Sequence, residues 1–172
     1  MKLPQYYQAD DRWGAKRYGL SNMKLTGCVP TALAMAISGL KEDVNPVQVA
    51  DFLYNMTMEL NTTFLGTSSL GVQEVVSQWG LNYKVIDSKE ELEKTLKNGT
   101  LVYGAVGHGI FVNGYSTHAV LLTGYENGKT KAFDPDNMAK TNKWYNIDDI
   151  WKERSLAPED NMTGGAFIAI YK

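Results

Sequence analysis

A run of apolar residues behind Pro30 is the feature that most constrains how this chain folds. Between Thr31 and Leu40 the sequence includes the unbroken apolar stretch Ala32–Ile37, which is rich in alanine. Proline is tolerated in a first helical turn, where its missing N–H would have no partner, and alanine has high helix propensity. A helix that is apolar on every side has to be buried on every side. The sequence therefore predicts a buried helix over this segment.

Three further helices are predicted, over about 46 to 54, 69 to 79 and 89 to 97. Asn45 and Pro46 supply a cap and a first-turn proline for the first of these, and Ser88 stands three residues before Glu91 in the pattern of a capping box. The segment over 69 to 79 has an apolar face at helical spacing despite Gly71. Residues 1 to 26 have no regular periodicity and indicate an irregular arm.

The second half of the chain changes to the short β-rich segments that are typical of strands. These segments are Leu81–Ile86, Thr100–Val106, His118–Gly124, Lys131–Phe133 and Ala166–Tyr171. Glu126-Asn127-Gly128-Lys129 has the composition of a hairpin turn between two of them. Helices that come before strands indicate an α+β fold in which a helical part with the buried helix packs on an antiparallel sheet.

Composition and length exclude several classes of protein. With 172 residues, 44% hydrophobic and 21% charged, the chain is expected to form one globular domain over residues 1–172. Seventeen basic and nineteen acidic side chains give a net charge of −2 without a run of Lys or Arg, which argues against a nucleic-acid partner. No stretch approaches the roughly 20 apolar residues of a transmembrane helix, and the first residues lack the apolar run of a secretory signal.

The single cysteine, Cys28, lies at the start of the predicted buried helix. One cysteine cannot form an internal disulfide, and two histidines, His108 and His118, give no zinc-finger spacing. Unpaired N–H groups and the dipole at a helix start favour a thiolate, and Gly27 would let the backbone turn tightly into the helix. The Cys28 N–H would then form half of an oxyanion hole. A buried thiol that only packs in the core is the alternative that this local context leaves open.

A nucleophile of this kind needs a base, and His118 begins a strongly apolar strand. Pairing across the Asn127-Gly128 turn would bring Asp134 near His118, as a close neighbour on the sheet that is not directly opposite. Asp134 would accept one ring N–H and leave the other nitrogen to take the thiol proton. Asp136 is the reserve candidate for this orienting role. The two aspartates also resemble the start of a calcium loop, but the third ligand and the glycine are missing, so no metal site is predicted.

These residues resemble the C39-like branch of the papain-like cysteine peptidases, over most of the length of the chain. The matching motifs, in the order of the family, are Gln8–Gly14, Gly27–Met35, His118–Tyr125 and Asp134-Pro135. The resemblance implies a papain-like fold, with Cys28 as nucleophile and His118 as base. It also favours Asp134 over Asp136, because this branch has Asp where papain has Asn.

The resemblance implies one residue that spacing alone does not identify. Gln8 matches the glutamine whose side-chain amide donates the second oxyanion hydrogen bond in this family. The chain departs from the family pattern at Val29, where a small residue such as Gly is frequent, and this departure is expected to narrow or reshape the pocket beside the nucleophile. His108 lies in a glycine-bearing loop before the His118 strand, where we expect a surface histidine rather than a substrate contact.

The combined interpretation is a cysteine peptidase or amidohydrolase that cleaves peptide or isopeptide bonds through a Cys28 thioester, without metal or organic cofactor. Transfer of the acyl group to an amine, with the same thioester, is an alternative. Another is a catalytically silent module that binds a peptide or wall glycan on an aromatic surface. That surface would be formed by Tyr6, Tyr7, Trp13, Tyr18 and Tyr115.

The resemblance also gives expectations about substrate and setting. Free domains of this branch in bacteria and phages suggest a peptide or peptidoglycan-peptide substrate and action outside the cell or at the envelope. We expect a monomer. The compartment stays open, because an excised mature domain with an added Met would have the same sequence features.

Overall fold

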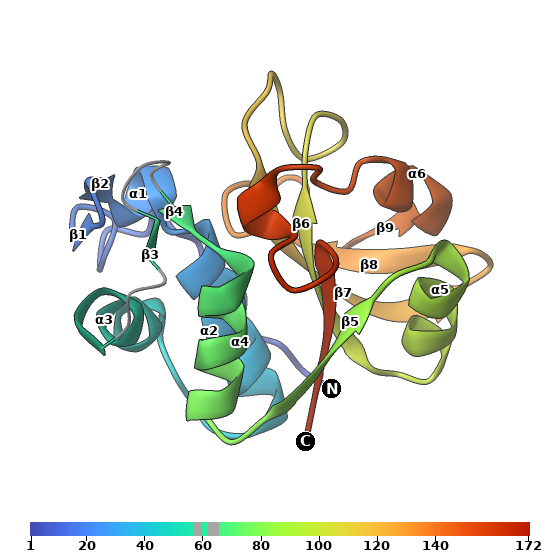
Figure 1. Cartoon of the computed structure of the whole chain (residues 1–172), viewed down its shortest axis with the longest axis horizontal. Coiled ribbons are helices and arrows are strands. Elements are labelled where there is room, and N and C mark those ends of the chain that lie inside the picture. Colours follow the sequence, from blue (N-terminus) through green and yellow to red (C-terminus); the bar gives the residue numbers. More distant parts are fainter. Residues whose placement is uncertain (57–59, 62–65) are drawn as a thin grey trace.

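The computed structural model of the chain describes residues 1–56, 60–61 and 66–172. A helical part and a sheet lie side by side (Figure 1). The helices are α1 (Met23–Thr26), α2 (Cys28–Leu40), α3 (Pro46–Met56), α4 (Ser69–Gln78), α5 (Lys89–Lys97), α6 (Ile147–Lys152) and a short 3₁₀ turn, η1 (Pro158–Asp160). The strands outside the main sheet are β1 (Arg17–Tyr18), β2 (Ser21–Asn22), β3 (Leu60–Asn61) and β4 (Gly66–Thr67).

The main sheet has six strands in the order β5-β10-β6-β7-β8-β9, and neighbouring strands are antiparallel throughout. Its strands are β5 (Asn82–Ile86), β6 (Leu101–Val106), β7 (His118–Glu126), β8 (Lys129–Phe133), β9 (Lys143–Asn146) and β10 (Phe167–Tyr171). The loop between β6 and β7 projects beyond the end of the sheet at the top of Figure 1. Strand β7 therefore begins at the foot of this loop, and its first residue is His118.

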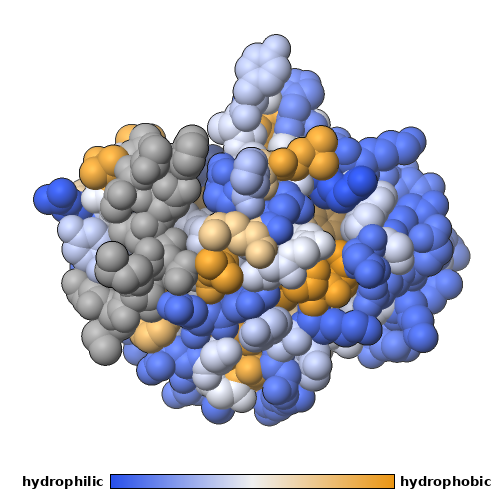
Figure 2. Space-filling model, in the orientation of Figure 1, coloured by the Kyte–Doolittle hydropathy of each residue, from blue (hydrophilic) through white to orange (hydrophobic). Residues whose placement is uncertain are grey.

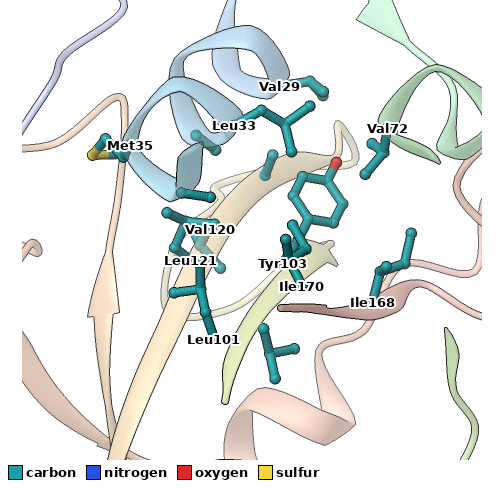
Figure 3. Packing of buried hydrophobic residues seen from close by; sticks show 14 of the residues in the cluster. Val29, Leu33, Met35, Val72, Leu101, Tyr103, Val120, Leu121, Ile168 and Ile170 are labelled. Atoms are coloured by element: carbon teal, nitrogen blue, oxygen red, sulfur yellow. The ribbon is translucent and has the colours of Figure 1, made fainter. Parts of the chain in front are cut away.

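Helix α2 is the element around which the two parts pack. Every residue from Val29 to Ile37 is buried, as the apolar composition predicts. Helix α2 contacts α3 and α4 on the helical side and β7 on the sheet side, while α5 contacts β7 as well. In Figure 3, Val120 of β7 lies next to α2, the helix that carries Leu33. One hydrophobic cluster thus joins the helical part to the sheet.

The predicted α+β class and the antiparallel sheet are confirmed, as are the four predicted helices and the hairpin. The capping signals act as expected: Ser88 Oγ accepts the Glu91 N–H at 3.1 Å. At the other predicted cap, Asn45 and Gln48 exchange two hydrogen bonds, of 2.9 and 3.0 Å. Asn127 and Gly128 have φ values of 48° and 79°, which is the left-handed geometry that a two-residue hairpin turn requires.

The buried helix begins at Cys28 and has Pro30 in its first turn, as predicted. Two other details of the sequence interpretation are wrong. The arm over residues 1 to 26 is not irregular throughout, since it contains the β1–β2 hairpin and α1. Strand β9 and helix α6 were not predicted, and β9 is an edge strand with largely exposed residues, so it lacks the apolar signal of a strand.

Within the part of the chain that the structure describes, no helix has the length and the apolar character that crossing a bilayer requires.

Candidate active site

A cavity of about 750 Å³ lies between the start of α2 and the sheet. Gln8, Cys28, His118 and Asp134 all line it, so the four residues singled out from the sequence are brought together. Two of them come from the N-terminal half of the chain and two from the sheet. The cavity thus has a helical wall, with Gln8 and Cys28, and a sheet wall, with His118 and Asp134.

Cys28 is the first residue of α2 and is partly buried. Thr31 N–H bonds to the Gly27 carbonyl at 3.1 Å, and the earlier N–H groups of the helix have no partner within it. These groups and the helix dipole favour negative charge on the Cys28 sulfur. The position therefore suits a thiolate nucleophile.

Gly27 is required for a different reason from the expected tight turn. Its φ of −91° is accessible to any residue. A Cβ at this position, however, would lie 2.6 Å from the Met23 carbonyl oxygen and 2.9 Å from the Met23 sulfur. The glycine therefore allows close packing of α1 against the start of α2, and this packing sets where Cys28 lies.

His118 is held by the carboxylate of Asp134. His118 Nε2 lies 2.6 Å from Asp134 Oδ1, and the two side chains are only 10% and 1% exposed. His118 is also hydrogen-bonded to the Cys28 side chain. Since Nε2 is engaged with Asp134, Nδ1 is the ring nitrogen that is left to face the sulfur.

The charge state of His118 follows from these contacts. Burial alone would lower the pKa of His118, but hydrogen bonds to Asp134 and Cys28, together with the charge of both groups, raise this pKa from 6.5 to about 10. The imidazole therefore carries a proton at neutral pH. It can stabilise a thiolate beside it and can donate its proton to a leaving group.

A one-residue bulge decides on which face of the sheet Asp134 lies. Beyond the bulge, Leu121 pairs with Phe133, so the register continues with Asp134 opposite Val120. His118 and Val120 are two residues apart on β7, so their side chains lie on the same face. Asp134 therefore shares a face with His118.

Without this bulge the register would differ by one residue. Next to the turn Glu126 pairs with Lys129, and the register shifts between Thr123 and Glu126. A ladder that continued regularly from the turn would put Asp134 opposite Leu121, on the other face from His118. Gly124, at φ 79°, supplies the left-handed residue that the bulge contains. The bulge thus makes the His118–Asp134 contact possible.

Asp134, not the reserve candidate Asp136, contacts His118. Asp134 Oδ1 also accepts the Asp136 N–H at 2.8 Å, and the Thr141 hydroxyl lies 2.6 Å from the Asp134 N–H. These contacts fix the Asp134 side chain in a buried position, while Asp136 is exposed at the rim of the cavity. The other carboxylate oxygen of Asp134, Oδ2, is buried and has no hydrogen-bond partner in the described parts of the chain.

Gln8 is buried although it lies in the arm, with 3% of its surface exposed. Its N–H donates to the Pro135 carbonyl at 2.8 Å, next to Asp134, so the arm is tied directly to the sheet wall. Its side-chain Nε2 donates one hydrogen to the Lys24 carbonyl at 3.0 Å. The second amide hydrogen is free to serve a ligand in the cavity.

Trp13 anchors the segment that carries Gln8. The indole is 4% exposed, its N–H donates to the Tyr7 carbonyl at 2.7 Å, and the Tyr6 ring packs against it edge to face. The Arg12 guanidinium covers the outer side of the ring at 4.4 Å from its centroid. The Arg-Trp pair in the sequence thus has a structural role, which is to fold the arm so that Gln8 reaches the cavity.

The aromatic surface considered for a binding module does not exist. Trp13 and Tyr18 are buried, Tyr6 and Tyr7 are half-buried, and Tyr115 alone is fully exposed, on the β6–β7 loop. On the face that Figure 2 shows, apolar side chains form small separate patches on a mainly hydrophilic surface. These aromatic residues therefore serve packing more than recognition.

Two other residues from the sequence analysis have clear positions. His108 is exposed, its Nδ1 lies 3.1 Å from the Gly114 carbonyl within the same loop, and it does not line the cavity. Val29 is buried, with 5% of its surface exposed, and lines the cavity next to Cys28.

Sequence reasoning did not identify several polar residues that line this cavity, among them Tyr103 and Asp160. Tyr103 lies in the middle of an apolar strand, and Asp160 follows a proline and a glutamate in a segment of loop composition. Neither pattern differs from that of an ordinary core tyrosine or surface aspartate. Only their shared position in the cavity distinguishes them.

Comparison with known proteins gives a family match over nearly the whole chain. The family model described as "Peptidase_C39 like family" matches residues 2–164. No curated protein matches the chain in sequence.

Solved structures share the fold at low sequence identity. A protein of Bacillus anthracis assigned to the C39-like peptidases is 17% identical, with 99% of this chain and 95% of that chain covered and a TM-score of 0.65. The peptidase domain of Streptococcus ComA, a bifunctional ABC transporter involved in quorum sensing, is 18% identical, with 86% and 90% covered and a TM-score of 0.56. The double-glycine-motif protease of an AMS/PCAT transporter, solved with its leader peptide, is 19% identical, with 99% and 90% covered and a TM-score of 0.56.

Proposed function

The chain belongs to the C39-like peptidase family of papain-like cysteine peptidases, and from this premise we propose that it cleaves peptide or isopeptide bonds through a thioester on Cys28. The observation that carries the proposal is the position of His118, which is hydrogen-bonded both to Asp134 and to Cys28 at the start of a buried helix. A thiolate and a protonated imidazole in contact are the starting state of such a reaction.

The first half of the reaction forms the acyl-enzyme. The Cys28 thiolate attacks the carbonyl carbon, and the carbonyl oxygen becomes an oxyanion that the Cys28 N–H and the Gln8 amide stabilise. His118 donates its proton to the leaving amine as the C–N bond breaks. A thioester, a free amine and a neutral His118 remain.

The second half releases the acyl group. Neutral His118 takes a proton from water, which attacks the thioester carbonyl through the same oxyanion site. The C–S bond breaks, the carboxylic acid leaves, and the thiolate and the protonated imidazole are restored. Asp134 keeps Nε2 of the imidazole engaged throughout, so that Nδ1 faces the sulfur and the substrate.

The substrate that we propose is a peptide, with peptidoglycan peptides as a further candidate. The AMS/PCAT transporter protease was solved with its leader peptide, which supports a peptide ligand for this fold. We also propose that the chain acts as a monomer, because all four groups come from one chain.

Replacement of the nucleophile tests this proposal. Cys28→Ala should reduce turnover of fluorogenic peptides and peptidoglycan fragments by at least about 10³-fold, because no other group can form the thioester. Circular dichroism and thermal unfolding control for the fold. Turnover by Cys28→Ala at the wild-type rate contradicts the proposal. Mass spectrometry with an added amine separates the two outcomes of the thioester, since hydrolysis gives an acid and acyl transfer gives an amide.

A further inference from the structure

The cavity that contains Cys28 also holds a buried carboxylate that the proposed reaction does not use. Asp160, at the end of η1, lines the cavity and is 8% exposed. The Ser155 hydroxyl donates to its Oδ2 at 2.5 Å, and the Thr117 side chain is a further hydrogen-bond partner. Both partners are neutral hydroxyls.

The described residues provide Asp160 with no cationic partner, since no Lys, Arg or His among them forms an ion pair with it. The adjacent Glu159 adds charge of the same sign. Burial raises the pKa of Asp160, the Ser155 hydrogen bond lowers it, Glu159 raises it and Thr117 lowers it. A buried carboxylate without a cationic partner is costly, and binding of a cation would relieve that cost.

Tyr103 on β6 supplies a second polar group in the same cavity. The side chain is 3% exposed and lines the cavity. In Figure 3 the ring rises from the sheet and its hydroxyl points toward the side where Val29 and Val72 lie. Burial, and the charge of Asp160, raise the pKa of Tyr103 well above 10, so the hydroxyl keeps its proton and can both donate and accept.

The cavity also has small apolar side chains, beside polar ones such as Thr67 and Thr117. Val29, Ala105 and Ala157 line the cavity, and none of them has a polar side-chain atom. An alkyl stem with a polar head fits such walls, since the stem contacts methyl groups while the head reaches the polar end. The side chain of lysine has this form.

We propose that Asp160 and Tyr103 form a subsite for a cationic, lysine-like side chain of the substrate, and that Asp160 is its specificity-determining residue. The inference rests on the proposed function, because the side chain must belong to a peptide whose scissile carbonyl lies at Cys28. The ammonium donates to the Asp160 carboxylate and to the Tyr103 hydroxyl. The buried charge gains its partner only when the substrate binds.

The expected change in rate follows from loss of the hydrogen bond between the substrate ammonium and Asp160. When an apolar contact replaces a charge-assisted hydrogen bond in a buried site, the second-order rate constant should fall by about 10- to 100-fold. Lysine and norleucine make a matched pair, because norleucine has the straight alkyl stem without the ammonium group.

The experiment measures covalent labelling of Cys28 by peptidyl acyloxymethyl ketones. The probes have lysine or norleucine at the first or second position before the reactive group, and intact-mass spectrometry gives the labelling rates. For the wild type, lysine at one position should label about 10- to 100-fold faster than norleucine. Asp160→Asn should bring this ratio close to one. Glu42→Gln, which removes the same charge at an exposed position outside the cavity, is the control and should leave the ratio within about threefold.

The outcomes separate this inference from the proposed function. Equal labelling by lysine and norleucine probes in the wild type overturns the subsite and leaves Cys28 established as the reactive group. A lysine preference that survives Asp160→Asn also overturns it. No labelling of Cys28 by any probe contradicts the proposed function, and the subsite with it. Anisotropy of the same labelled peptides with Cys28→Ala checks the preference in binding alone, where Asp160→Asn in that background should again remove it.

Discussion

The two walls of the cavity are held in place by different forces. On the helical wall, Cys28 is fixed by the packing of α2, in which every residue from Val29 to Ile37 is buried. On the sheet wall, His118 and Asp134 are fixed by strand register and by hydrogen bonds. The position of Cys28 therefore depends on apolar packing, and the position of His118 depends on the pairing of two strands.

The contacts at the bulge illustrate the second kind of support. The Thr130 hydroxyl bonds to the Thr123 carbonyl at 3.3 Å and to the Gly124 carbonyl at 2.8 Å, so it bridges the irregular part of β7. A densely packed helix keeps its position when one side chain changes, because many contacts hold it. A strand register, in contrast, shifts by a whole residue when it shifts, and this moves every side chain to the other face. We therefore expect substitutions on the sheet wall to reduce activity more than stability, and substitutions on the helical wall to do the reverse unless they remove a reacting group.

The largest effect in this comparison is expected at Asp134. Asp134→Ala should reduce kcat by about 10⁴-fold, because no group then accepts the Nε2–H of the imidazole or stabilises its charge. Asp136→Ala is the matched control and should change kcat by less than about threefold, since exposed charges contribute little. Steady-state kinetics on one fluorogenic peptide measures both. A larger loss for Asp136→Ala than for Asp134→Ala would reverse the assignment of the orienter.

The next effect concerns Gln8 of the arm, for which we propose the role of oxyanion donor. Gln8→Ala should reduce kcat by about 10²- to 10³-fold with little change in KM, because an oxyanion donor acts mainly in the transition state. Gln5→Ala, at an exposed position in the same arm, should leave both constants near the wild-type values. An increase in KM alone for Gln8→Ala would show that the amide binds substrate rather than the oxyanion.

Gly27 on the helical wall and Gly124 on the sheet wall test the difference between the two walls directly. Gly27→Ala brings a methyl group against the Met23 carbonyl and should lower the free energy of unfolding by about 2 kcal/mol. Gly124→Ala meets only ordinary contacts with Trp144 but has a left-handed backbone, so it should cost about 1 kcal/mol.

Urea unfolding and kcat of the folded protein should separate these two variants. We expect Gly124→Ala to lose the larger share of activity, because loss of the bulge turns Asp134 to the other face of the sheet. Equal activity of the two variants would mean that the register does not depend on this glycine.

The smallest effect is expected in the titration of His118. In the wild type the pKa of His118 is raised to about 10, so its protonated form stabilises the fold fully below pH 6.5, and this contribution is lost as pH rises through 10. Asp134→Asn should lower that pKa by at least about one unit, because a hydrogen bond and a charge that favour the imidazolium are removed.

An NMR titration of the ring protons measures the His118 pKa in both proteins. The chain has two histidines, so His108→Gln leaves a single imidazole signal. A His118 pKa near 6.5 in the wild type would contradict the charged pair, and with it the protonated leaving-group donor.

The sequence motifs predicted residues that meet in one cavity. Local residue types indicate where Cys28, His118 and Asp134 lie in the secondary structure. Cys28 begins a helix, His118 begins a strand and Asp134 follows a hairpin strand, so the sequence could predict that they meet. Gln8 needed the family resemblance, since its burial depends on Trp13 and on a bond to Pro135 that no local pattern indicates. The prediction of an exposed aromatic surface was wrong, because composition does not show which aromatic rings are buried in the core.

The sequence by itself determined the α+β class, the buried helix and the hairpin, because hydrophobic periodicity, caps and turn residues act over a few neighbouring positions. Only the tertiary structure decided that a bulge turns Asp134 toward His118, that Gly27 is needed for close packing, and that Asp160 and Tyr103 share the cavity. These features arise where segments distant in the chain meet. Contact between such segments depends on register and packing, which the order of the residues does not display locally.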